Sequence, residues 1–154
     1  MQLYHCNIGY PFLSPDCELL FPSKSVKGAN PYSEENLEKW NQITEPEKIG
    51  EMCFIHELEN RNGHSCVGMF NHKLQIGFML WFENHDLDRF LQWRYLNCGE
   101  YVIGLEPATN YAGGKRQEKE ENRIKILEPG TSVKHKLRFE FFDSLDKLKT
   151  AMER

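Results

Sequence analysis

Several features that would assign the chain to a common class of protein are missing from its sequence. The 154 residues contain no apolar run near the ~20 residues that a membrane helix requires, and the amino terminus lacks the basic and apolar segments of a secretion signal. No GxSxG elbow, phosphate-binding loop or dinucleotide fingerprint occurs, which argues against serine hydrolases, nucleoside triphosphatases and dehydrogenases. We therefore expect a cytoplasmic protein that makes no membrane contact.

Cysteine and histidine are present, but their spacing does not indicate a metal site. The five cysteines are odd in number and scattered, with no CxxC pair, which argues against a disulfide framework and against a zinc ribbon. The six histidines form no HxH pair and no helical pair with a partner acid. We expect reduced thiols, no bound metal and no cofactor.

The charge balance gives no reason to expect a polyanionic partner. Lysine and arginine number 19 against 23 acidic residues, for a net charge of -4. This balance argues against binding to nucleic acid or to an anionic membrane and fits a neutral or weakly polar ligand better. The chain is 40% hydrophobic, which is enough for the core of one domain over residues 1–154.

Alternating apolar residues predict a mainly β protein. Every second residue in 74–82 falls on one apolar face, and only three residues separate this segment from the apolar run 66–70. We therefore predict an antiparallel hairpin. Residues 133–141 alternate with charged residues and predict a half-exposed strand. Frequent proline and glycine within 14–32 predict short strands and turns. Together these segments indicate an antiparallel β-sandwich.

Short helices and surface segments are expected beside these strands. Ser33 can cap one helix, and Ser144 can cap another at the end of the chain. Residues 85–94 fit either a short helix or a loop that leads into a strand. The run 115–123 mixes charges of both signs, so we expect it to be a solvated surface segment.

Two residues are candidates for acid and base chemistry. Glu106 follows the apolar strand 101–105 and precedes Pro107, which is expected to end that strand. Its apolar neighbours would raise the pKa of the carboxyl toward a value that suits a general base. His5 lies at an expected strand end, and an imidazole changes its charge near neutral pH. Each has a structural alternative, because Glu106 can bind loop amides and His5 can be a packed, hydrogen-bonded residue.

Three stretches of the sequence together resemble one protein family. They are LYHCNIGYPFLSP at 3–15, FLQWRYLNCGEYVIGLEPATN at 90–110 and ILEPGTSVKHKLRFEF at 126–141. They are similar to the DUF4432 group of aldose 1-epimerase-like proteins, within the galactose mutarotase-like superfamily. The resemblance implies part of a β-supersandwich that binds a monosaccharide in an open cleft. It also implies a cofactor-free isomerase in which Glu106 is the general base and His5 is the general acid.

Other side chains are candidates for contacts with the sugar. Those near the two candidate catalytic residues are expected to bind hydroxyl groups or to cover a C–H face. They are Asn7, Gln92, Trp93, Arg94 and Asn110. His56 is included because its neighbourhood is where the sugar-binding aspartate of the family would be sought. Lys115 and Arg116, with Arg94, can favour an anionic substituent, and this is left open.

The resemblance covers only the carboxy-terminal half of longer family members. Half of a sandwich would leave sheet edges and apolar faces exposed, which proteins usually cover. Three alternatives follow: the chain pairs with itself as a homodimer that completes the sandwich, it is a truncated form that binds sugar poorly, or another polypeptide supplies the missing half. A carbohydrate-binding domain without catalysis and a structural or interaction domain remain alternatives to an epimerase.

Overall fold

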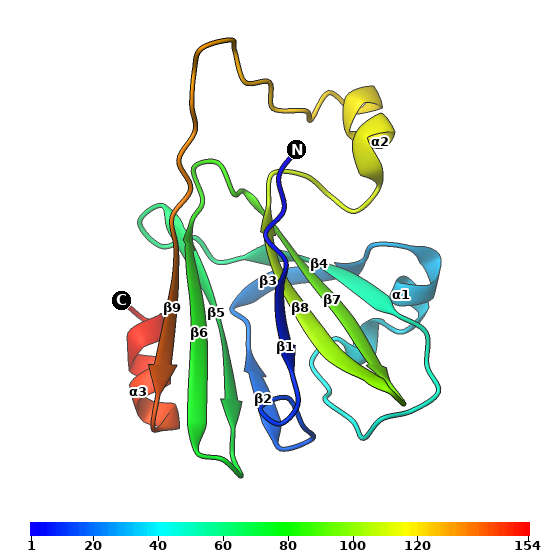
Figure 1. The fold of residues 1–154 in the computed structure, drawn as a ribbon, viewed down its shortest axis with the longest axis vertical. Coiled ribbons are helices and arrows are strands. Elements are labelled where there is room, and N and C mark those ends of the chain that lie inside the picture. The colour runs from blue at the N-terminus through cyan, green and yellow to red at the C-terminus, as the bar shows by residue number, and fades with distance from the viewer.

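The computed structural model describes residues 1–154 and consists mainly of antiparallel strands in two sheets (Figure 1). Sheet A has the strand order β1-β8-β7-β4-β3, and sheet B has the order β2-β5-β6-β9. The strands of sheet A are β1 (Cys6–Gly9), β3 (Ser23–Gly28), β4 (Met52–Leu58), β7 (Arg89–Asn97) and β8 (Glu100–Ala108). Those of sheet B are β2 (Cys17–Leu20), β5 (His64–Asn71), β6 (Ile76–Glu83) and β9 (Leu137–Phe142). The predicted antiparallel β-sandwich is confirmed.

The predicted hairpin forms the centre of sheet B. Strands β5 and β6 pair along their whole length, from His64 opposite Glu83 to Asn71 opposite Ile76. Alternate residues of β6 face the sandwich core, and the residues between them are covered by α3 (Leu145–Met152), which packs Leu148 on this outer face. Ser144 caps α3 as predicted. Both faces of the hairpin are therefore buried.

The core between the sheets determines which side chains of β8 face outward. Ile103 and Leu105 are fully buried in the cluster that joins the two sheets. Since successive residues of a strand point to opposite faces, Gly104 and Glu106 lie on the outer face of sheet A. We call this surface the outer face of sheet A from here on.

Strand β8 continues beyond the point where proline was expected to end it. Pro107 is paired with Phe90, and the strand runs to Ala108, so Glu106 lies within a strand and the prediction of a strand end was wrong. The carbonyl of Pro107 accepts a hydrogen bond from the Tyr4 amide on the β1 side. The N–H that proline lacks would point to that same side, where regular pairing with β1 has already ended.

The short helices also differ from the expectation. Helix α1 (Pro31–Glu35) is capped by Asn30 instead of Ser33, and η1 (Leu37–Lys39) is a separate 3-10 turn. Ser33 is buried, and its hydroxyl accepts a hydrogen bond from the Cys53 amide. The undecided segment 85–94 enters β7, so the strand alternative is the one observed.

The charged run 115–123 is only partly a solvated segment. Most of it forms α2 (Gly114–Glu120), which stands apart from the strands at one end of the sandwich in Figure 1. Glu118 is 1% exposed because it is paired with Arg123 and accepts a hydrogen bond from the Tyr111 amide. The prediction therefore missed one buried carboxylate within an otherwise exposed run.

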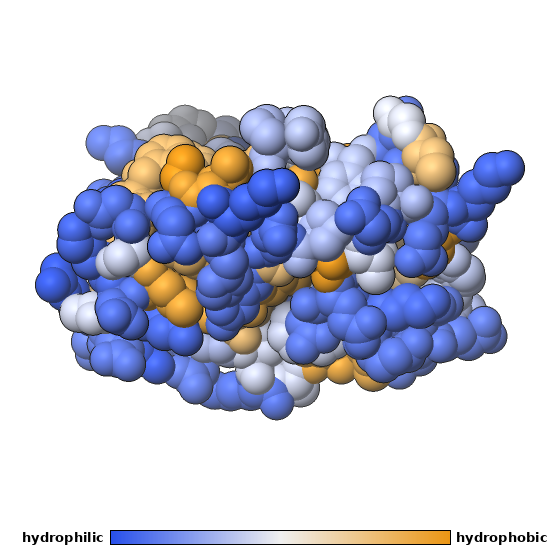
Figure 2. All heavy atoms as spheres, turned by 90° about the horizontal axis from the view of Figure 1, so that it is seen from below, coloured by the Kyte–Doolittle hydropathy of each residue, from blue (hydrophilic) through white to orange (hydrophobic).

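Apolar side chains reach the surface at the edge of sheet B. Phe139 and Phe141 pair with Leu80 and Phe78, so they belong to the inward-facing side of β9. They are nevertheless 51% and 73% exposed, which means that sheet A does not extend over this edge strand. Figure 2 shows apolar residues at the surface on the side of the molecule where sheet B lies.

Three further findings concern the chain as a whole. No helix has both the length and the apolar character needed to cross a membrane. All five cysteines are free. No group of three or more histidine, cysteine, aspartate or glutamate side chains is arranged to hold a metal ion.

Candidate active site

His5 and Glu106 meet on the outer face of sheet A. The register pairs Cys6 with Leu105, which places His5 beside Glu106 at the start of β1. The distance from His5 Nε2 to Glu106 Oε1 is 2.9 Å. The carboxylate side chain is 6% exposed and the imidazole is 43% exposed. Residues a hundred positions apart in the sequence thus come into direct contact as one acid–base pair.

Gly104 provides the space in which this pair forms. A Cβ atom added at Gly104 would lie 2.8 Å from Glu106 Oε1 and 2.8 Å from His5 Cε1. Real Cβ atoms do not approach other atoms so closely, so both side chains would have to move. The glycine is therefore needed for close approach of two side chains and not for an unusual backbone conformation.

Replacing Gly104 with alanine is expected to separate the pair. The half-exposed imidazole can rotate away into solvent, so the fold should survive with a loss on the order of 1–3 kcal/mol in the free energy of unfolding. The NMR chemical shifts of the His5 ring, compared at one pH, should change because Glu106 would no longer contact it. Gly9→Ala is the matched control, since its Cβ would meet only Tyr101 O, at 3.5 Å. Unchanged chemical shifts of the His5 ring in Gly104→Ala would contradict this role.

Burial dominates the electrostatics of Glu106. Desolvation raises the pKa of its carboxyl to about 7, because the charged form loses contact with water. A carboxyl with that pKa exchanges its proton readily near neutral pH, which is the property that a general base requires. The sequence predicted that apolar neighbours would raise the pKa of Glu106, and the burial of its carboxyl acts in that direction.

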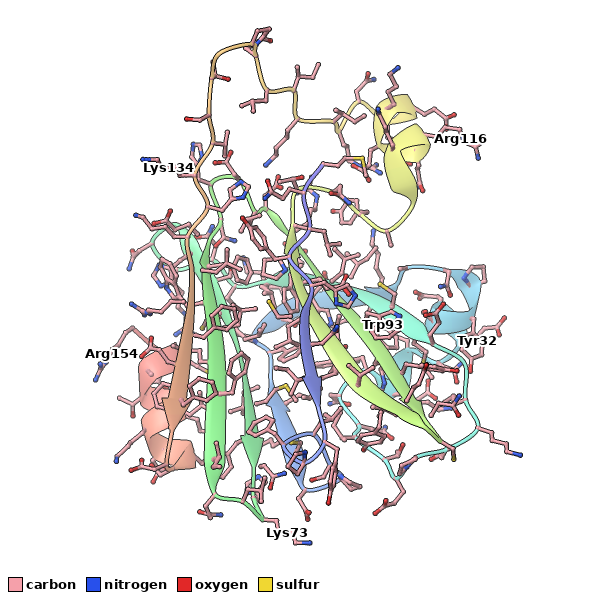
Figure 3. The ribbon with its side chains drawn as sticks, viewed as in Figure 1. Tyr32, Lys73, Trp93, Arg116, Lys134 and Arg154 are labelled. Atoms are coloured by element: carbon pink, nitrogen blue, oxygen red, sulfur yellow. The ribbon has the colours of Figure 1, made fainter.

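The aromatic side chain of Trp93 lies beside the pair. Its ring is edge-on to His5, with 5.6 Å between the centroids, and its indole N–H donates a hydrogen bond of 2.9 Å to Glu51. Figure 3 labels Trp93 next to strands β7 and β8. Asn7 is exposed and lies opposite Gly104 on the same face. The structure thus brings Asn7 and Trp93 together with the pair.

Three other predicted contact residues point away from the pair. Gln92, Arg94 and His56 lie on the inner face of sheet A, because each alternates with outward-facing residues of its strand. Gln92 binds His56 Nε2 and the carbonyl of Trp40, and Arg94 binds backbone carbonyls including Gln42 O. We correct their expected placement: they stabilise the interior and the loop that covers it.

The sequence could not distinguish these placements without the register. Gln92 and Trp93 are neighbours in the sequence, yet only one of two adjacent strand residues can face the pair.

Desolvation lowers the pKa of His56 to about 4, so this buried imidazole is neutral at physiological pH. It is a packed, hydrogen-bonded histidine.

Asn110 lies just beyond the end of β8 and is 7% exposed. Its amide donates a hydrogen bond of 3.0 Å to the carbonyl of Tyr111. It therefore shapes the turn that follows the strand. Arg116, on α2, projects away from the strands into solvent in Figure 3.

The arrangement can exchange protons with a ligand laid on an open surface. The more prominent cavities of the molecule are lined by residues other than His5 and Glu106; they lie along sheet B, near the start of β4 and beside the long loop before β9. The pair instead stands on one face of sheet A with an aromatic side chain at its edge. This combination of a sheet face, a shifted carboxyl and a histidine makes the surface a candidate acid–base site on an antiparallel β-sandwich.

Comparison with known proteins identifies the group to which this sandwich belongs. A solved structure described as a putative aldose 1-epimerase from Klebsiella pneumoniae superimposes with a TM-score of 0.88 at 26% sequence identity. The match covers 98% of this chain and 40% of that chain, so the protein has the fold of part of an aldose 1-epimerase-like structure. Residues 1–141 match the family described as "Domain of unknown function (DUF4432)", and the chain belongs to that family. No curated protein matches the sequence significantly.

Proposed function

We propose that the protein binds a monosaccharide on the outer face of sheet A and interconverts its anomers by general acid–base catalysis. The single observation that supports this most is the contact of 2.9 Å between His5 and the buried Glu106. The similar solved structure is described as a putative aldose 1-epimerase, and it has the same fold over nearly all of this chain. No cofactor is needed for the reaction, since every step is a proton transfer or a C–O bond change.

The two residues take opposite parts in the proposed reaction. Glu106 removes the proton of the C1 hydroxyl while His5 donates a proton to the ring oxygen, and the C1–O5 bond breaks to give the open-chain aldehyde. Rotation about the C1–C2 bond exposes the other face of the carbonyl. Ring closure reverses both proton transfers and gives the other anomer. Both reacting oxygens are attached to C1, so an acid and a base in direct contact suit this chemistry.

Asn7 and Trp93 are proposed to position the sugar. Trp93 offers an apolar surface for the C–H side of the ring, and its indole is held in place by Glu51. The exposed amide of Asn7 can donate to one hydroxyl and accept from another. Polarimetry or NMR with pure anomers of glucose and galactose tests the activity, and the comparison with a Glu106 variant is developed in the Discussion.

A second candidate function is carbohydrate binding without catalysis. It is favoured by the position of the pair, because the more prominent cavities of the molecule are lined by residues other than His5 and Glu106 and a catalytic site usually shields its ligand from water. Binding of glucose or galactose without faster interconversion of the anomers would favour this function over the first.

We further propose that a second copy of the chain completes the sandwich as a homodimer. β1 and β9 are edge strands, and Phe139 and Phe141 expose the inward-facing side of β9. A second copy presents the same apolar strip, so a two-fold contact would cover both copies at once.

The solution mass tests the homodimer directly. We expect a species of twice the 18.2 kDa chain mass in sedimentation equilibrium, and Phe141→Asp is expected to convert it to the monomer. Ile126→Asp is the control, because Ile126 is 80% exposed but lies in the loop before β9. A strictly monomeric wild-type protein would rule out self-pairing and leave the other two alternatives, a truncated form that binds sugar poorly or a different polypeptide as the partner.

A further inference from the structure

Three cationic side chains meet around one tyrosine ring near the acid–base pair. The centroid of the Tyr111 ring lies 5.7 Å from Lys27 Nζ, 4.9 Å from Arg89 Cζ and 5.1 Å from Arg123 Cζ. A ring attracts a cation modestly at an exposed site, by roughly 0.5–1 kcal/mol. The three like charges repel one another, although carboxylates paired with Arg89 and Arg123 offset part of this repulsion. An anion bound among them would relieve this repulsion.

Only two of these cations are available to a ligand. Arg123 is held by the buried carboxylate of Glu118, at 2.9 Å, and also contacts Glu121. Arg89 is paired with a single neighbour, Asp88, at 2.8 Å, and this carboxylate is 36% exposed. Lys27 is exposed and takes part in no side-chain hydrogen bond or salt bridge of the structure. Its charge is therefore balanced by no carboxylate of the chain.

Both available cations lie on the same face of sheet A as the pair. Glu106 lies opposite Leu91, Leu91 opposite Ile55, and Ile55 opposite Lys27. Arg89 precedes Leu91 by two residues on β7 and so points to the same side. With strands ~4.8 Å apart and a rise of ~3.4 Å per residue, Arg89 Cα lies roughly 8 Å from Glu106 Cα. Lys27 lies three strands from Glu106, with about 14 Å between their Cα atoms, but its side chain reaches the same Tyr111 ring as Arg89. These two cations and the pair can therefore contact opposite ends of one small molecule.

We propose that Lys27 and Arg89 form a subsite for an oxyanion substituent on the sugar whose anomeric carbon lies at His5 and Glu106. This inference rests on the proposed function and names its substrate class: a hexose that carries a phosphate or carboxylate at the end away from C1. A guanidinium can bind such a group through two parallel hydrogen bonds, and an ammonium supplies a point charge. The residues considered from the sequence for this role lie elsewhere: Arg94 on the inner face of sheet A, and Lys115 and Arg116 on α2.

Binding of three sugars to four proteins tests the subsite. Calorimetry or ligand-observed NMR would compare glucose, glucose 6-phosphate and glucuronate with wild type, Lys27→Gln, Arg89→Gln and Lys73→Gln. Lys73 lies in the turn at the end of the β5–β6 hairpin, on the other sheet, so its variant removes the same charge far from the site (Figure 3). We expect wild type and Lys73→Gln to bind at least one anionic sugar about tenfold more tightly than glucose. Each subsite variant should lose most of that preference, and added salt should weaken it in wild type.

The outcomes separate this inference from the proposed function. Equal affinity of wild type for all three sugars would overturn the subsite and leave the proposed function standing. A preference for anionic sugars that survives both subsite variants would also overturn it. Preferential binding that depends on Lys27 and Arg89, without interconversion of anomers, would support the subsite and overturn catalysis. Binding of none of the three sugars would overturn both.

Discussion

Replacing Glu106 with glutamine is expected to remove the catalysed interconversion of anomers, with a loss of roughly 10²–10⁴-fold in the enzymatic rate. The glutamine amide has nearly the shape of the carboxyl, so its oxygen can keep the contact with His5. It cannot accept the proton of the C1 hydroxyl, so the base is lost while the geometry is kept. The measurement is the rate at which pure α-glucose or α-galactose approaches equilibrium, corrected for the uncatalysed reaction.

Two comparisons make this result specific. Glu57→Gln removes an exposed carboxylate from strand β4 of the same sheet and should leave the rate unchanged. His5→Gln should lower the rate by a similar factor as Glu106→Gln, because the general acid is then missing. A Glu106→Gln protein that keeps the wild-type rate would show that Glu106 is not the base. A wild-type protein without activity would favour the binding function.

The same substitution is expected to stabilise the folded protein above pH 7. Burial raises the pKa of Glu106 from 4.5 to about 7, so the folded protein binds this proton more tightly than the unfolded chain does. The resulting stabilisation is complete below pH 4.5 and is lost as the pH rises through 7. The shift corresponds to about 3 kcal/mol, which is an upper value because the partner His5 lies beside the carboxylate. Glutamine has no proton to lose and avoids this cost.

His56 produces the opposite dependence on pH. Its pKa falls from 6.5 to about 4 on burial, so the unfolded chain binds the proton more tightly and stability decreases as the pH falls from 6.5 to 4. In wild type the two effects oppose each other between pH 4.5 and 6.5. In Glu106→Gln only the His56 effect remains, so stability should rise with pH across that window by up to about 3 kcal/mol.

Urea unfolding followed by tryptophan fluorescence between pH 4.5 and 8 would measure both curves. The difference in the free energy of unfolding between wild type and Glu106→Gln isolates the glutamate, since all other titrating groups are shared. The free energy of unfolding of wild type minus that of Glu106→Gln should decrease as the pH rises from 4.5 to 7. A difference that does not change with pH would mean that the pKa of Glu106 is not raised by folding.

Local patterns in the sequence were sufficient for much of sheet B. Strict alternation in residues 74–82 and three connecting residues predicted the β5–β6 hairpin, and a serine before an amphipathic segment predicted α3. Such features depend on neighbours along the chain, so they can be recognised without the fold. The strand end at Pro107 was wrong because the effect of a proline depends on which side of the strand its missing N–H would face.

Residue types and the family resemblance selected Glu106 and His5 from the sequence, as a carboxylate and an imidazole beside apolar strands. Only the tertiary structure decided that they touch, because their contact depends on the pairing of β1 with β8 and on the absence of a side chain at Gly104. It also decided that Trp93 faces the pair while Gln92 and Arg94 face the core, since a strand register turns alternate residues to opposite sides. The gathering of Lys27 and Arg89 around Tyr111 is likewise a consequence of strand order, which no local pattern in the sequence specifies.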